Sequence, residues 1–105
     1  MLNKNQSGDC WSVTATHATA AVATKDAATG KTHFITHVSA SSDKAGSILT
    51  VKQGTTTVWQ LKIGASMIDL DFSSSPIKAA SNALVSADID GTSRADVNLA
   101  GFTLE

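Results

Sequence analysis

The chain has little of what fixes small folds covalently or covers protein surfaces with charge. Its 105 residues include one cysteine, Cys10, so no intramolecular disulfide can form. Charged residues make up 16% of the sequence, below the ~25% usual in soluble proteins, and the net charge is -1. Nucleic-acid binding needs clustered Lys and Arg, whereas the eight here are scattered, so that class of function is not expected.

Long apolar runs, tyrosine and proline are also scarce. No run approaches the ~20 apolar residues of a membrane-spanning helix. The polar start of the chain lacks the apolar core of a signal peptide, so we expect none. Tyrosine is absent, which disfavours the aromatic platforms of carbohydrate-binding sandwiches. The single proline, Pro76, belongs in a loop because proline cannot donate to a central strand ladder.

What the chain has instead is period-two alternation of Thr, Val, Ile, Leu and Ala, interrupted by Gly, Ser, Asn and Asp. Such alternation is typical of half-buried β-strands. No segment is a strong crossover helix, so parallel sheets are not expected. The sequence therefore predicts an all-β fold, an antiparallel β-sandwich of about eight short strands. The expected strands are 11–17, 32–40, 47–53, 55–63, 67–72, 77–80, 83–89 and 95–104.

Two further segments complete the domain organisation. Residues 18–28 fit a helix, because alanine has the best helix propensity, but their short length and flanking threonines favour a strand. Residues 1–9 read as a flexible polar arm, and residues 10–105 as a single β-sandwich domain.

Alternation also assigns side chains to the two faces of each strand. In 32–40 it predicts two sets, Phe34, Thr36 and Val38 on one face, and His33, Ile35 and His37 on the other. In 95–104 it points Val97 and Leu99 inward, and Phe102 as well if the pattern shifts at Gly101.

No segment carries a complete catalytic, cofactor or metal motif, so no residue is assigned to those roles. The segment 29–32 ends like a phosphate-binding loop but lacks the earlier glycine, and a strand rather than a helix follows it. The segment 88–96 resembles a calcium loop faintly, with its glycine and its twelfth residue out of place.

Two histidines and two tryptophans remain as candidates for contacts with a partner or a ligand. His33 and His37 are ~13 Å apart if they lie on one strand, too far to bind a single zinc ion. Trp11 and Trp59 would be interface anchors or sugar-stacking residues if exposed, although the alternation places Trp59 in the core.

Several segments, taken in order, carry a resemblance to a known group of proteins. They are Trp11-Ser12-Val13-Thr14, Gly30-Lys31-Thr32-His33-Phe34-Ile35-Thr36, Val58-Trp59, Ser75-Pro76-Ile77 and Val97-Asn98-Leu99-Ala100-Gly101-Phe102. This order resembles that of small virion proteins of tailed bacteriophages. The resemblance implies a jelly-roll-like β-sandwich that works by assembly, often as a trimer, and it implies no catalytic residues.

These observations lead to one functional hypothesis and one alternative. We expect a non-enzymatic phage structural protein without cofactors, made in the host cytoplasm and placed on the capsid or tail surface. Its partners would be copies of itself, as a homotrimer, and the major capsid or another virion protein. The alternative is a carbohydrate- or receptor-binding module of a tail or surface adhesin.

Overall fold

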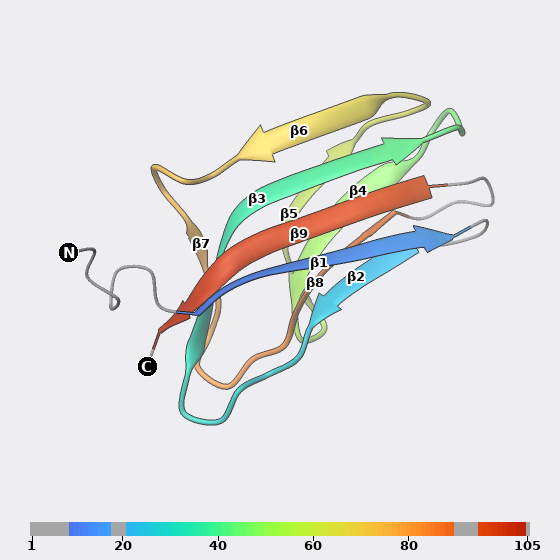
Figure 1. The fold of residues 1–105 in the computed structure, drawn as a ribbon. Helices are drawn as coiled ribbons and strands as arrows, with labels where there is room; N and C mark the ends of the chain where they lie inside the picture. Colours follow the sequence, from blue (N-terminus) through green and yellow to red (C-terminus); the bar gives the residue numbers. More distant parts are fainter. Residues whose placement is uncertain (1–8, 18–20, 90–94, 105) are drawn as a thin grey trace.

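Two antiparallel sheets lie face to face in the computed structural model, which describes residues 9–17, 21–89 and 95–104 (Figure 1). The strands are β1 (Asp9–His17), β2 (Ala21–Lys25), β3 (Thr32–Ser42), β4 (Ile48–Gln53), β5 (Thr56–Lys62), β6 (Met67–Asp71), β7 (Ile77–Lys78), β8 (Val85–Ile89) and β9 (Ala95–Leu104). The expected all-β class is confirmed, and no helix occurs in the described ranges. Those ranges accordingly contain no helix able to cross a membrane.

Each sheet has two edge strands, and the strand order places one edge strand of each sheet on either side of the structure. One sheet, here called sheet A, has the order β1-β9-β3-β6, with β7 pairing to β3. The other, sheet B, has the order β2-β8-β4-β5. Because β1 and β9 approach β2, and β8 approaches β9 and β3, the edges β1 and β2 lie on one side. The edges β5 and β6 therefore lie together on the opposite side.

Most expected strands are found, with small differences at their ends. The preference for a strand within 18–28 is confirmed by β2. The expected strand 77–80 is shorter, because only Ile77 and Lys78 pair with β3. Residues 1–8 of the expected N-terminal arm, and residues 90–94 of the segment 88–96 that resembles a calcium loop, lie outside the described residues.

Alternation builds the core between the sheets. In β1, Trp11, Val13 and Ala15 face inward, and the intervening residues are exposed. The fully buried large side chains come from the central strands and include Ile35, Val38, Leu49, Val51, Val85, Ile89, Val97 and Leu99. The β4–β5 hairpin turns at Gly54, as expected, with a φ of 57° that glycine adopts readily.

The face assignment within β3 is wrong, because a β-bulge interrupts the alternation. The pairing of β3 with β9 shifts between Ile35 and His37. An extra residue in one strand moves the following side chains to the other face. His33, Ile35 and Val38 are therefore buried, and His37 is exposed. The two histidines, predicted to share a face, lie on opposite faces of sheet A.

The inward position of Phe102 is also wrong, because β9 continues its alternation through Gly101. Val97 and Leu99 point inward as expected, followed by Gly101 and Thr103. Phe102 lies on the outer face and stacks on Phe34, with ring centroids 4.9 Å apart and planes 7° apart. The irregularity expected in β9 lies in β3, directly across from Gly101.

Candidate functional site

Trp11 and His33 meet at the end of sheet A where β1 begins. The register places His33 of β3 opposite Thr103 of β9, and Trp11 of β1 opposite Gly101. The His33 side chain is 1% exposed. Its Nδ1 lies 2.7 Å from the Thr103 hydroxyl, and its Nε2 lies 2.7 Å from the carbonyl oxygen of Asp26. The histidine therefore ties the β2–β3 connection to two strands of sheet A.

The partners of His33 define its proton positions. A carbonyl oxygen only accepts, so Nε2 carries the proton that is donated to Asp26. In the neutral ring Nδ1 then accepts a hydrogen bond from the Thr103 hydroxyl. The Thr103 oxygen in turn accepts a hydrogen bond of 2.9 Å from Nε1 of Trp11. Each polar group in this chain of hydrogen bonds has a partner, which is the condition for burying it cheaply.

Trp11 is partly buried, and its ring packs against neighbouring side chains. Its ring meets His33 edge to face, with centroids 5.7 Å apart. The ammonium group of Lys25 lies 5.8 Å from the ring centroid, within the range of a cation–π contact. A Cβ atom built on Gly101 would lie 2.9 Å from Cζ2 of Trp11 and 1.9 Å from the carbonyl oxygen of Phe34. The absence of a side chain at Gly101 thus makes room for the indole.

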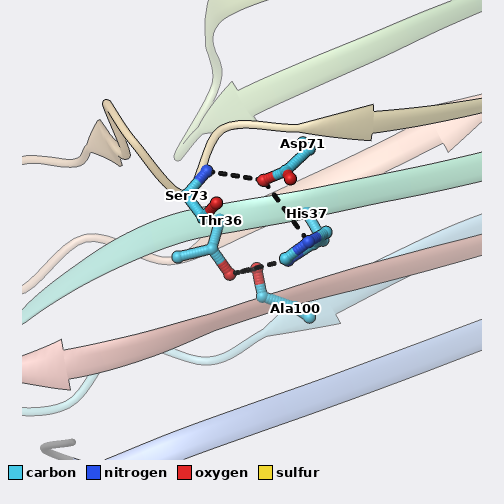
Figure 2. A network of polar contacts seen from close by, with 5 residues as sticks. All are labelled: Thr36, His37, Asp71, Ser73 and Ala100. Atoms are coloured by element: carbon cyan, nitrogen blue, oxygen red, sulfur yellow. Dashed lines mark hydrogen bonds and ion pairs between the residues drawn. The ribbon is translucent and has the colours of Figure 1, made fainter.

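His37 takes part in a separate network on the outer face of sheet A (Figure 2). Its Nε2 lies 3.4 Å from Oδ1 of Asp71 on β6, and the two side chains are 50% and 64% exposed. The Thr36 hydroxyl lies 3.3 Å from Nδ1 of His37 and donates to the carbonyl oxygen of Ala100, 3.3 Å away. Exposure on this scale makes the His37–Asp71 pair a weak contributor to stability.

Asp71 is the group in this network whose acidity is altered. Hydrogen bonds from Ser73 lower the pKa of Asp71 below its ordinary value of 3.8, and the nearby His37 lowers that pKa further. The backbone N–H of Ser73 donates to Oδ1 of Asp71 over 2.8 Å. The carboxylate therefore anchors the turn that follows β6.

The residues Asp71, His37 and Thr36 have the types of a catalytic triad but not its arrangement. A base activates a nucleophile by accepting its proton. The Thr36 proton instead points to the carbonyl of Ala100. A hollow on the same outer face, lined in part by Ser39, Ser41 and Asn98, has a volume of about 90 Å³. Ligand pockets are usually several-fold larger.

The structure does not bring the sequence-predicted residues together into one site. His33 and Trp11 share a buried network, His37 lies on the opposite face, and Trp59 is on the distant edge strand β5. Trp59 is half-buried and meets Phe72 edge to face, with centroids 5.7 Å apart. In the described ranges no cluster of three or more potential metal-ligating side chains occurs.

Three contributors to these networks were missed by sequence reasoning. The signal for Thr103 was present, because it continues the alternation that begins at Val97. The carbonyl of Asp26 and the pairing of Asp71 with His37 depend on register between distant strands, which one sequence does not reveal.

Comparison of the chain with protein-family models, with curated proteins and with solved structures found no match.

Proposed function

We propose that this chain is a non-enzymatic structural protein of a phage particle, a jelly roll that decorates or stabilises the capsid as a homo-oligomer. The observation that supports the proposal best is the order in which the strands pair. The function itself comes from the resemblance, and the strand pairing supports it because it fits the fold that the resemblance implies.

The pairing is that of one long hairpin rolled up. β4 pairs with β5, β3 with β6, β2 with β8 and β1 with β9, so each pair encloses the previous one along the chain. Two further pairs, β9 with β3 and β8 with β4, form when the hairpin wraps onto itself. Viral capsid proteins and lectins are among the proteins built on such double-sheet jelly rolls. In a jelly roll of this kind the other eight strands form the fold, and the two-residue β7 is an extra strand.

The surface fits a protein that binds through assembly rather than through a pocket. The outer face of sheet A carries short polar side chains joined across strands. Thr14 donates to Asn98 over 2.7 Å, and Asn98 donates to Ser39 over 3.2 Å. A polar face of this kind can form hydrogen bonds with a partner protein, as protein interfaces commonly do.

The packing of both tryptophan rings against neighbouring side chains favours this function over the carbohydrate-binding alternative. Sugar stacking needs an open aromatic face, whereas Trp11 is covered by His33 and Lys25, and Trp59 packs on Phe72.

Composition of purified particles tests the proposal. We expect quantitative mass spectrometry of particles from the phage that encodes this chain to find it in a fixed ratio to the major shell protein. Adding the chain back to depleted particles should raise their disruption temperature, because a ligand that binds only the assembled state stabilises it. Particles that lack the polypeptide would refute the proposal.

A further inference from the structure

The side of the structure formed by β5 and β6 is left open, and apolar side chains fill the opening. Where the end of β1 meets the start of β2, the inward side chains are small and include Ala15, Ala21, Ala23 and Ala95, whereas Val13 and Trp11 lie nearer the start of β1. On the opposite side they are large and only partly buried. These residues, here called the seam, are Trp59, Leu61, Ile63, Ile68, Leu70 and Phe72.

Exposed apolar residues flank the seam. Three large hydrophobic side chains are exposed in the described ranges, and two of them lie here, Val58 at 38% and Met67 at 80%. A contiguous apolar strip beside exposed residues of this kind is typical of an interaction surface.

The two edge strands of the seam carry opposite charges. In β5 the only charged residue is Lys62, and in β6 the only charged residues are Asp69 and Asp71. All three side chains are exposed. A β6 edge would repel another β6 edge through Asp69, whereas a β5 edge attracts it. The β5 edge of one copy of the chain is therefore complementary to the β6 edge of another copy.

The directions of the two strands permit this pairing. The end of β5 and the start of β6 lie at the same end of the structure, where the hydroxyl groups of Ser42 and Ser47 are 2.7 Å apart. The strands therefore run in opposite directions. A rotation about an axis parallel to them preserves direction, so β5 of one copy would meet β6 of the next in the antiparallel sense.

We propose that copies of this chain join through the seam, with β5 of one copy pairing antiparallel with β6 of the next around a closed ring. The inference rests on the proposed role as a self-assembling structural protein and assigns the surface that assembles. The regular stretch of β5 from Trp59 to Lys62 forms the contact, because a register shift after Val51 leaves Val58 in a bulge. The ring buries the seam, and Lys62 reaches Asp69 of the neighbouring copy.

A charge swap tests this assignment. We expect Lys62→Glu and Asp69→Lys each to weaken self-association about tenfold or more, since each places like charges across the interface. The double variant, which restores the opposite charges, should recover most of the wild-type association. Sedimentation equilibrium at low ionic strength measures all three association constants.

Two further variants distinguish an effect of the seam on self-association from a general effect of the net charge. Asp43→Lys makes the same change of charge in the exposed β3–β4 loop and should leave association unchanged. Met67→Thr shortens an exposed apolar side chain that flanks the seam, so association should weaken while the melting temperature of the monomer stays the same. Equal effects of Asp43→Lys and Asp69→Lys, or no recovery in the double variant, would overturn the assignment.

A wild-type chain that is monomeric at every concentration would also overturn the seam assignment. That result would leave the proposed virion role to be tested by the composition of particles. Failure of the seam assignment and failure of the proposed function are therefore distinguishable.

Discussion

The indole Nε1 of Trp11 donates a hydrogen bond to the hydroxyl of Thr103, and the same hydroxyl donates to Nδ1 of His33. One threonine thus links an edge strand, β1, to the centre of sheet A. The link holds the β2–β3 connection as well, because His33 donates to the carbonyl of Asp26. The arrangement is a structural clamp at the end of sheet A where the chain enters the fold.

Removing the hydroxyl of Thr103 should destabilise the fold more than shortening the side chain. We expect Thr103→Val to lower the free energy of unfolding by about 2 kcal/mol or more, because Trp11 and His33 both lose a partner. Thr103→Ser keeps the hydroxyl and should cost about 1 kcal/mol for the lost methyl group. Urea unfolding measures both values, and equal stability of the two variants would show that the clamp is unimportant.

Truncation of the two histidines should change the melting temperature to different extents. His33→Ala removes a buried ring, and with it the acceptor of the Thr103 hydroxyl proton and the donor to the Asp26 carbonyl. Its melting temperature should therefore fall by several degrees, as for a loss of about 1 kcal/mol or more. His37→Ala removes an exposed ring on the other side of the bulge and should change the melting temperature little. Similar losses in both variants would contradict the bulge in β3.

A side chain at Gly101 should be poorly tolerated. A methyl group there would collide with the Phe34 carbonyl and with Trp11, so we expect Gly101→Ala to cost about 1–3 kcal/mol or more. Ala100→Ser, on the opposite face of the same strand, serves as the control and should change stability by about 0.5 kcal/mol at most. Thermal unfolding of both variants makes the comparison, and a Gly101→Ala variant as stable as the control would contradict the close approach.

The all-β class and most of the strand ranges could be predicted from the sequence, but the pairing register of the strands could not. Alternation in 11–17 and from Val97 to Leu99 identifies the inward residues, because a half-buried strand must place every second side chain in the core. The bulge between Ile35 and His37 breaks this rule, and it appears only in the pairing with a distant strand, in which Gly101 lies opposite Ile35.

For the candidate site, too, the sequence identifies the residue types but not the contacts that depend on distant strands. Trp11 and His33 were identified by residue type, and their position in the core depends on contacts with Thr103 and Asp26 that are distant in sequence. The half-exposure of Trp59 depends on β5 being an edge strand, which sheet order decides and local sequence does not.

The acidity of Asp71 offers a test of the outer network. Ser73 and His37 stabilise the carboxylate, so the pKa of Asp71 lies below its ordinary value. Because the folded-state pKa is lowered, any stability from these contacts is present above the unfolded-state value and is lost as the pH falls through the folded-state value. We expect Ser73→Ala to raise the pKa of Asp71 towards 3.8, as followed by carboxyl NMR titration. Ser74→Ala should leave it unchanged, and the same pKa in both variants would contradict the role of Ser73.

The central claim is that this sandwich-like protein assembles on the surface of a phage particle. An electron cryomicroscopy reconstruction of the phage particles proposed to carry the chain tests it most directly. The account predicts symmetric copies of the two-sheet fold on the capsid, joined along the edges of β5 and β6. A well-resolved reconstruction in which no density fits these two sheets would contradict it.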